Sequence, residues 1–474
     1  MKNNRRNFLK WTGIAGLSIT GGSILKGFSA EPDQKTTNVF KAANHVQHFN
    51  MCGYAAPKID TVKVGFIGLG QRGPGHVSNL SKLEGVEIKG LCDVRPEMVN
   101  KVKKSLAGSN HQPKLYTGSK DSWKKLCENK DIDLIYISTP WDLHASMALY
   151  AMEQGKHVAI EVPAAVTVEE CWQLVEASER TRKHCMMLEN CCYDFFELLT
   201  LNMARQGFFG EIVHAEGAYL HDLINLNFQK DGYYEMWRLK ENYRNGNLYP
   251  THGLGPVCQV MDINRGDKLD YLVSMSGKDF SMGERAKELA AKDDFFKPFE
   301  NQTYRGNMNT TTIRTTKGRT IMLQHDVSSP NVYSRIHKIS GTKGSALKYP
   351  QPGRIATSEK ESWLTKEEMK AIEIKYQPAI VKKIGEIAKE VGGHGGMDFL
   401  MNWRLIDCLR NGLPLDQDVY DAALWSAIAP LSEQSIGNRS NSVDIPDFTN
   451  GSWKENIPVD MLLEKGGTTK VKLK

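Results

Sequence analysis

Beyond its first thirty residues, the sequence lacks an excess of charge of either sign. The formal net charge of the chain is +6. Five cationic residues precede the first acid, Glu31: Lys2, Arg5, Arg6, Lys10 and Lys26. The rest of the chain therefore carries a balance of only +1. A nearly neutral body gives no electrostatic reason to bind nucleic acid or an anionic membrane, so we expect a small molecule or a glycan as partner.

The nine cysteines show no spacing typical of a disulfide framework or a metal site. Their number is odd, and no Cys-x-x-Cys pair occurs. Most stand in apolar runs, as in Leu91-Cys92 and Val257-Cys258. We expect small core residues that fold under reducing conditions, and no metal ion.

The sequence has no run long and apolar enough for an integral membrane span. The most apolar part of the leader, residues 8–25, is rich in glycine and broken by Lys10. The start of the leader, Arg5-Arg6-Asn7-Phe8-Leu9-Lys10, resembles the twin-arginine signal that exports folded proteins to the bacterial periplasm. We expect residues 1–30 to be such a signal; a disordered basic tail is the alternative. Phe28 stands where a cleavage site prefers a small residue, so the cleavage point stays open.

From residue 62 to 190, apolar runs alternate with helical patterns, whereas residues 31–61 are polar and read as a linker or an arm. The alternation predicts parallel strands joined by right-handed crossover helices. Expected strands are 63–68, 86–92, 134–138, 157–160 and 185–188; expected helices are 96–106, 144–154 and 168–182. We therefore predict a doubly wound Rossmann domain of the α/β class over residues 62–190.

After residue 190 the pattern changes to longer runs rich in threonine, valine and isoleucine. Expected strands are 212–219, 310–316, 320–326 and 332–340, with a turn at Lys317-Gly318. A helical region, 397–433, is expected to pack across them. Residues 191–474 are thus predicted to form an α+β substrate-binding domain with a largely antiparallel open sheet.

A glycine motif links the first strand to the first helix of the predicted Rossmann domain. Gly68-Leu69-Gly70-Gln71-Arg72-Gly73 has the GxGxxG spacing that turns tightly and lets a pyrophosphate approach the backbone. Asp93 closes the second strand, where an acid binds the adenosine ribose and favours NAD over NADP. Arg95, two residues on, leaves NADP open, and a glycine turn without nucleotide is the plainer alternative.

Two later segments follow strands at the same edge of the sheet. They are Thr139-Pro140-Trp141-Asp142-Leu143-His144 and Glu161-Val162-Pro163. Cofactor and substrate meet at this edge in doubly wound folds. Both segments are therefore candidates for the site.

The two predicted domains resemble those of the glucose-fructose oxidoreductase and inositol dehydrogenase superfamily. The turn Ser340-Gly341-Thr342-Lys343-Gly344 is similar to one in that group. The superfamily's usual signature after the fifth strand is Glu-Lys-Pro, whose lysine takes part in hydride transfer, but this chain has Val162 at the position of that lysine. The best acid/base candidate of a plain alcohol dehydrogenase is therefore missing.

Glycoside hydrolase family 109, bacterial NAD-dependent alpha-N-acetylgalactosaminidases, is the branch that these departures resemble. Besides the glycine motif, the likeness rests on Ala56-Pro57-Lys58, Thr139-Pro140-Trp141, Glu161-Val162-Pro163, Tyr249-Pro250-Thr251-His252-Gly253-Leu254-Gly255-Pro256 and Tyr333-Ser334-Arg335. Asp142-Leu143 departs from the Glu-Trp expected in that family.

The resemblance implies two sets of binding residues. For NAD, beside Gly68, Gly70 and Gly73, it implies Gln71, Arg72, Asp93, Trp141, Asp142, Leu143, His144, Glu161, Val162 and Asn190. For the sugar it implies Tyr219, Arg238, Tyr249, Pro250, Thr251, His252 and Tyr333. The plainer readings are a cross-strand aromatic for Tyr219 and Tyr333, a surface ion pair for Arg238 and a backbone contact for His252.

The resemblance also implies a route that differs from the usual pair of carboxylates. NAD⁺ oxidises the sugar at C3, the C2 proton and the group at C1 leave, water adds, and the cofactor is regenerated. Tyr249 and His252, three residues apart, are the candidates for proton transfer, without assignment of steps. His394, between Gly392-Gly393 and Gly395-Gly396, reads as part of a flexible loop.

Two other functions stay open at this point. One is a net sugar oxidoreductase of the same superfamily, and the other is a non-catalytic NAD-bound sugar sensor. The aglycone, the exact sugar and the oligomeric state, including a homo-oligomer, stay open as well.

Overall fold

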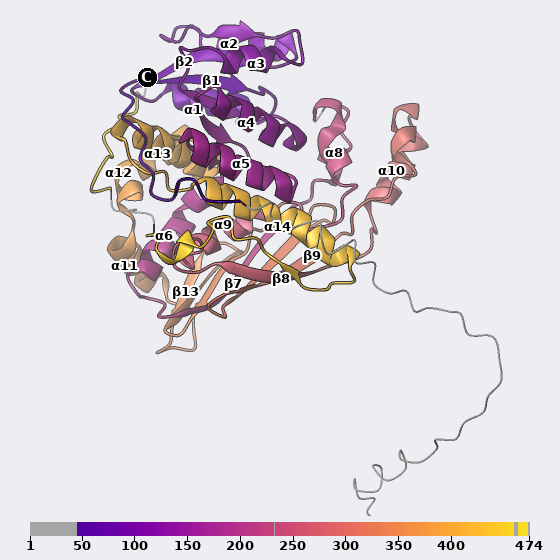
Figure 1. The fold of residues 1–474 in the computed structure, drawn as a ribbon. Helices are drawn as coiled ribbons and strands as arrows, with labels where there is room; N and C mark the ends of the chain where they lie inside the picture. Colours follow the sequence, from indigo (N-terminus) through magenta and orange to yellow (C-terminus); the bar gives the residue numbers. More distant parts are fainter. Residues whose placement is uncertain (1–44, 232, 459–462, 473–474) are drawn as a thin grey trace, which may run out of the picture. The chain divides into compact units, whose positions relative to one another are not determined.

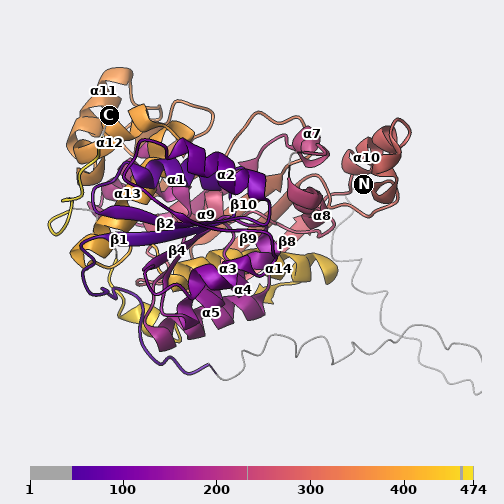
Figure 2. The same ribbon diagram turned by 90° about the horizontal axis from the view of Figure 1, so that it is seen from above.

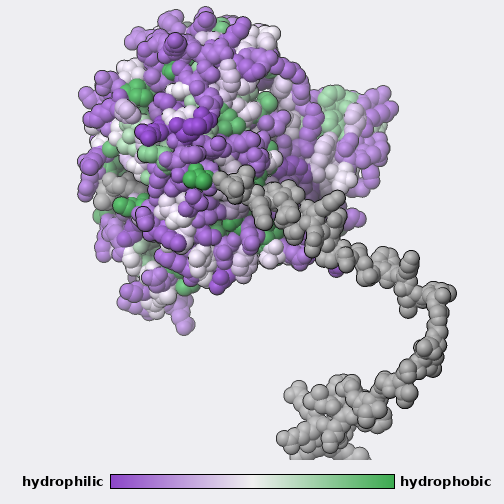
Figure 3. Space-filling model, in the orientation of Figure 1, coloured by the Kyte–Doolittle hydropathy of each residue, from purple (hydrophilic) through white to green (hydrophobic). Residues whose placement is uncertain are grey.

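A computed structural model describes residues 45–231, 233–458 and 463–472 (Figure 1). The expected signal, residues 1–30, lies outside them. All described residues belong to one compact unit, Ala42–Lys474. Within them, no helix is both long and apolar enough to cross a membrane. Figure 3 shows a mostly hydrophilic face with small separate hydrophobic patches.

The first sheet has six parallel strands in the order β3-β2-β1-β4-β5-β6. They are β1 (Val62–Ile67), β2 (Val86–Cys92), β3 (Lys114–Tyr116), β4 (Leu134–Ile137), β5 (His157–Ile160) and β6 (Cys185–Met187). Every residue of β4 and β5 is buried, as in a parallel sheet covered on both faces. The predicted Rossmann domain is confirmed; the short edge strand β3 was missed because three residues show no periodicity.

Helices cover this sheet on its two faces (Figure 2). They are α1 (Gly73–Ser81), α2 (Pro96–Ser105), α3 (Ser122–Cys127), α4 (His144–Glu153) and α5 (Val168–Thr181). α5 begins with a capping box in which the Thr167 hydroxyl accepts from the Glu170 N–H and the Glu170 carboxylate accepts from the Thr167 N–H. The helix boundaries lie within one residue of those predicted.

The second sheet has eight strands in the order β13-β12-β11-β7-β10-β9-β8-β14. They are β7 (Ile212–Leu220), β8 (Leu269–Ser276), β9 (Asn309–Thr315), β10 (Thr320–Asp326), β11 (His337–Gly341), β12 (Gly344–Lys348), β13 (Arg354–Thr357) and β14 (Val443–Asp444). Only β7 and β10 pair in parallel; the other pairs are antiparallel. The largely antiparallel sheet is confirmed, with Gly318 at φ +83° in the predicted turn between β9 and β10.

Two predicted elements of the second domain need correction. The strand expected over 332–340 is interrupted, because Ile336 has a φ of +40°, and only β11 continues. The helical region 397–433 is two helices, α13 (Met397–Asn411) and α14 (Val419–Gly437), since Gly412 ends α13 in the left-handed conformation. α14 packs between α5 of the Rossmann domain and β8 of the second sheet (Figure 1).

The remaining helices are α6 (Phe195–Arg205), α7 (Ile224–Asn227), α8 (Trp237–Glu241), α9 (Thr251–Val260), α10 (Met282–Ala290), α11 (Lys366–Tyr376) and α12 (Ala379–Val391). The described part of the predicted arm, residues 45–61, lies against the core: the Gln47 amide donates to the Tyr420 hydroxyl and the His48 N–H to Glu179. Eight of the nine cysteines are buried and all are free, which confirms their expected place in the core.

Gly73 and Gly75 in the first turn of α1 give a matched test of the glycine motif. A Cβ at Gly73 would lie 2.1 Å from the Gly68 carbonyl oxygen, whereas a Cβ at Gly75 would meet open space. We expect Gly73→Ala to lower the free energy of unfolding by about 1–3 kcal/mol and to weaken dinucleotide binding. Gly75→Ala should leave both unchanged or slightly raise stability. Thermal unfolding with and without NAD measures this, and equal behaviour of the two variants would contradict it.

Candidate active site

The glycine turn lies at the carboxyl edge of β1. Gly68 has a φ of +89°, and a Cβ there would lie 2.5 Å from the Ser138 carbonyl oxygen, so glycine is required. Gly70 and the exposed Gln71 follow it. Among the described residues, no side chain caps α1 and its first turn holds no acid. The N–H groups of the turn and of the helix start can therefore receive a pyrophosphate.

Asp93 lies where the ribose-binding acid was predicted. Its buried carboxylate accepts from the Leu69 N–H at 2.8 Å and from Arg95 Nε at 3.1 Å. The Arg95 guanidinium lies 5.1 Å from the ring centre of Tyr234. Asp93 thus holds the glycine turn in shape and places its negative charge beside it.

Arg72, Glu161 and Asn190, all predicted cofactor residues, belong to one polar network. Arg72 donates from Nε to Glu161 at 2.9 Å and from Nη1 to Asp398 at 3.1 Å. Asp398 also accepts from the Asn190 amide at 2.6 Å and lies 2.8 Å from His394 Nδ1. Burial opposes ionisation of Glu161, but Arg72 and His76 together outweigh this effect and lower the pKa of that carboxyl.

The segment after β4 turns through residues 141–143 into α4. Trp141 is buried and the side chains of Asp142 and Leu143 are exposed. His144 lies behind the turn, with its ring nitrogens 2.7 Å from the Pro163 carbonyl oxygen and 2.8 Å from that of Thr139. Burial lowers the pKa of His144. The neutral ring has one N–H, so it donates to one of these two carbonyl oxygens. Its contact with the cofactor stays a prediction.

Val162 occupies the position of the lysine that related dehydrogenases use. It is 3% exposed, and its N–H donates to Glu161 Oε2 at 3.3 Å. An aliphatic side chain here supplies no acid or base. Proton transfer must therefore come from elsewhere in the site.

Aromatic rings from both domains form one continuous cluster. Trp141 stacks on Tyr249 with ring centres 5.5 Å apart, and Tyr249 lies 4.7 Å from Tyr219. Tyr333 lies 6.2 Å from Tyr219. The guanidinium of Arg238, on α8, lies 5.3 Å from the ring centres of both Trp141 and Tyr249. The structure therefore joins the predicted sugar residues to the predicted cofactor turn.

His252 stands in the first turn of α9, which Pro250 precedes and the buried Thr251 begins. Its Nδ1 lies 2.8 Å from Glu189 Oε1. Glu189 is fully buried, and burial opposes its ionisation. His252, together with the Thr251 side chain and the Cys191 N–H, outweighs this effect and lowers the pKa of the carboxyl. A carboxylate on Nδ1 leaves Nε2 as the proton-accepting atom of the ring.

Close packing of α9 on β7 fixes the position of His252. A Cβ at Gly253 would lie 2.4 Å from the Ala218 nitrogen, and one at Gly217 would lie 2.6 Å from the Gly253 backbone. Only glycine at both positions permits this approach. His252 is thus placed by the backbone as well as by its carboxylate partner.

Burial strongly raises the pKa of Tyr249, and the neighbouring Arg238 only partly opposes this effect. The phenol is therefore protonated at neutral pH. In this arrangement the phenol can offer a hydrogen-bond donor.

Sequence reasoning missed Glu189 and His221. Glu189 follows β6 at the active edge of the sheet, directly before Asn190, and that position was its only signal. His221 Nδ1 lies 3.0 Å from the Tyr219 hydroxyl, two residues earlier on the same face. Strand periodicity relates this pair once Tyr219 is known to face the site.

Within the described residues, one group has ligand atoms close enough for a metal: Glu189, Cys191 and His252. Hydrogen bonds already explain why these three residues lie close together, because Glu189 accepts from the Cys191 N–H and lies against His252. Burial raises the pKa of the Cys191 thiol well above its ordinary value, which disfavours a thiolate ligand. The predicted absence of metal stays a prediction.

The fold and the active edge define the chain as a Rossmann protein of the oxidoreductase type with a second, sheet-based domain. Residues 62–189 match the model of the oxidoreductase family with an NAD-binding Rossmann fold. Levoglucosan dehydrogenase in complex with NADH superposes with a TM-score of 0.61 at 18% identity, over 82% of this chain and 100% of the other.

Residues 193–455 match the model described as glycosyl hydrolase 109, C-terminal domain. A glycosyl hydrolase family 109 protein of Bacteroides fragilis is 47% identical, over 94% of this chain and 96% of its own. An alpha-N-acetylgalactosaminidase of Bacteroides fragilis is 50% identical, over 86% of this chain and 96% of its own. The chain belongs to glycosyl hydrolase family 109, is a glycoside hydrolase and has an NAD-binding Rossmann domain, which confirms the resemblance.

Replacing Glu189 tests its role as the positioning residue of His252. Glu189→Gln keeps the shape but removes the charge that stabilises a protonated imidazole, so kcat should fall at least about tenfold with a smaller change in KM. The acidic limb of the pH–rate profile should move to lower pH.

The exposed Glu367→Gln on α11 is the matched control for this variant. If Glu189 were merely structural, Glu189→Gln would lower the melting temperature and leave the pH–rate profile in place. That outcome would contradict the assignment.

Proposed function

We propose that the protein hydrolyses terminal alpha-N-acetylgalactosamine residues with a tightly held NAD⁺ that is regenerated in each turnover. The observation that carries the proposal is the Glu189–His252 pair beside Tyr249, which stacks on Trp141 of the cofactor turn. The sugar specificity is supported by the name of the relative that is 50% identical.

The residues at the Rossmann edge fit a nicotinamide dinucleotide. The turn at Gly68 and the uncapped start of α1 suit the pyrophosphate, and Asp93 suits the ribose. Trp141, Glu161 and Val162 follow the ends of the next strands, at the edge where cofactor and substrate meet in doubly wound folds. When bound, NAD⁺ supplies a hydride acceptor for C3 of the sugar and a hydride donor at the end of the turnover.

His252 is the base in this proposal. Glu189 holds Nδ1, so Nε2 can take a proton from the sugar, at O3–H or at C2–H. The buried carboxylate stabilises the positive charge that then develops on the ring.

Tyr249 and Arg238 direct the sugar. The protonated Tyr249 phenol donates a hydrogen bond to a sugar oxygen, and the Arg238 guanidinium offers fixed donors to hydroxyls or to the acetamido carbonyl. Tyr219, Trp237 and Tyr333 surround them with ring faces that exclude water and pack against the pyranose.

A net sugar oxidoreductase is the second candidate, and the fold that the chain shares with levoglucosan dehydrogenase favours it. The buried Val162, in place of the expected lysine, stands against it.

A chromogenic assay separates the candidates. Incubation with p-nitrophenyl alpha-N-acetylgalactosaminide and no added nucleotide should release nitrophenol without lasting NADH absorbance. His252→Ala and Tyr249→Phe should each lower kcat by at least about a hundredfold, because each removes a proton-transfer or donor group.

Stoichiometric NADH accumulation would replace hydrolysis by net oxidation. A protein that carries nucleotide but turns over no glycoside would instead be a sugar sensor. Wild-type rates in both variants would remove the assigned roles.

We also propose export to the periplasm by the twin-arginine route. The support is the leader sequence from Arg5 to Leu25 and the nine free cysteines, which suit folding in the cytosol before export. Lysine in place of both Arg5 and Arg6 should keep the protein in the cytosolic fraction of a bacterial host. Unchanged fractionation would exclude this route.

A further inference from the structure

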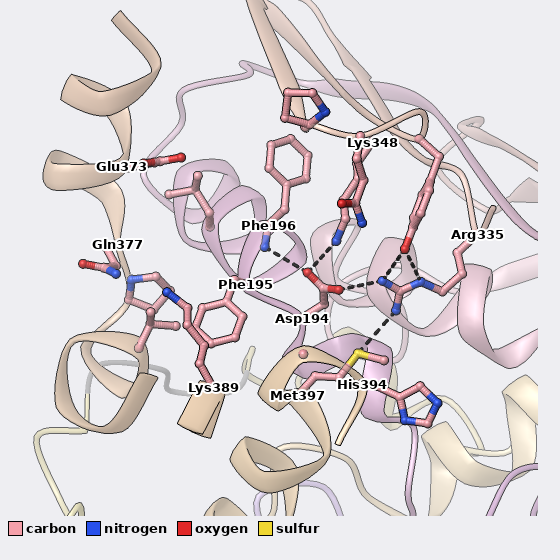
Figure 4. A pocket seen from close by; sticks show the side chains of 18 of the residues that line it. Asp194, Phe195, Phe196, Arg335, Lys348, Glu373, Gln377, Lys389, His394 and Met397 are labelled. Atoms are coloured by element: carbon pink, nitrogen blue, oxygen red, sulfur yellow. Dashed lines mark hydrogen bonds and ion pairs between the residues drawn. The ribbon is translucent and has the colours of Figure 1, made fainter. Parts of the chain in front are cut away.

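A cavity of about 630 Å³ adjoins the aromatic cluster without including His252 or Arg238 (Figure 4). Its walls come from α6, from α11 and α12, and from the segment that follows β12. Tyr333, His394 and Gly395 line its near end. The role proposed above for the sugar site leaves this space unassigned.

The rings of the active site continue into this cavity. Tyr219 lies 6.2 Å from Tyr333, and Tyr333 lies 6.0 Å from Tyr349, which lines the cavity. A molecule bound at Tyr219 can therefore extend past Tyr333 without leaving the protein surface. The cavity is placed to receive the part of a substrate that is attached to the sugar being cleaved.

We propose that this cavity binds a neutral oligosaccharide aglycone, the sugar units next to the glycosidic bond. The inference rests on the proposed glycosidase function and adds the class of leaving group. The volume of the cavity lies within the range of about 300–1,000 Å³ that is usual for ligand sites.

The chemistry of the lining suits sugar rings. Phe195 and Phe196 of α6 and Tyr349 offer apolar faces of the kind that pack against pyranose C–H groups. Glu373 and Gln377, at the end of α11, face Phe195 and Phe196 across the cavity (Figure 4). Carboxylate and amide groups pair with the vicinal hydroxyls of a sugar.

The Arg and Lys side chains around the cavity are already paired with carboxylates of the protein. At the floor, Asp194 accepts from Arg335 at 2.6 Å and from Lys348 at 2.5 Å, and Lys348 also donates to Glu197 at 2.9 Å. At the rim, Lys389 lies 2.9 Å from Glu386. Two carboxylates thus oppose the two floor cations, so a neutral ligand is favoured over an anionic one.

An extended peptide is the less favoured occupant. Peptides that bind along a sheet do so by pairing with a strand edge. The edge strands of this sheet are β13 and β14, and none of the described residues that line the cavity belongs to either of them. The lining therefore offers side chains and no strand edge.

The double variant Glu373→Ala/Gln377→Ala tests the proposal, with the exposed Lys375→Ala on the opposite side of α11 as the matched control. Three substrates carry the same terminal alpha-linked amino sugar: a nitrophenyl glycoside, a neutral tetrasaccharide and a glycopeptide. For the double variant, kcat/KM on the tetrasaccharide should fall about tenfold, as expected for two lost hydrogen bonds, while the nitrophenyl glycoside is unaffected. The control should match wild type on all three.

An equal fall on the nitrophenyl glycoside and the tetrasaccharide, or no fall on either, would overturn the proposal. A fall confined to the glycopeptide would assign the cavity to peptide instead.

A binding measurement keeps this test separate from the proposed function. The trisaccharide that lacks the terminal amino sugar should give saturation-transfer NMR signals with wild type that weaken in the double variant. Equal or absent signals would overturn the cavity assignment even in an active glycosidase. Binding without any glycosidase activity would contradict the proposed function alone.

Discussion

The contact between Glu189 and His252 joins the segment after β6, the last strand of the Rossmann sheet, to the first turn of α9. Glu189 is fully buried and His252 is nearly so, which makes an unpaired member costly. Gly217 and Gly253 bring α9 against β7, so the ring has little freedom to move away. The positions of Tyr249 and Trp141 follow, since Tyr249 stands three residues before His252 and stacks on Trp141.

A second set of polar contacts joins the glycine turn to the start of α13 and to the loop before it. Arg72 bridges Glu161 and Asp398, and Asp398 in turn contacts Asn190 and His394. The five residues from Gly392 to Gly396 all have positive φ. Four of them are glycines, which adopt this conformation without strain. The predicted cofactor residues Arg72 and Asn190 are thus held in place by Asp398 of the second domain.

Local signals predicted the Rossmann domain well. Gly68 and Gly73 in the turn, Asp93 at the end of β2 and the buried runs of β4 and β5 reflect constraints within a few residues. Glu189 and Asp398 could not be found this way, because their partners His252 and Arg72 lie 63 and 326 residues away and only the fold brings them together. The interrupted strand at Ile336 shows the same limit, since a left-handed β-branched residue follows from tertiary contacts rather than propensity.

In the proposed mechanism a base and a dinucleotide meet at one edge of the sheet, so that cleavage proceeds through loss of the proton on C2 of the sugar. Hydrolysis in deuterium oxide, with mass and NMR analysis of the released amino sugar, tests this most directly. Because C2 loses its proton and regains one from the solvent in this mechanism, each product molecule should carry one non-exchangeable deuterium at C2. Product with hydrogen retained at C2 would contradict it, because direct displacement at C1 leaves that position untouched.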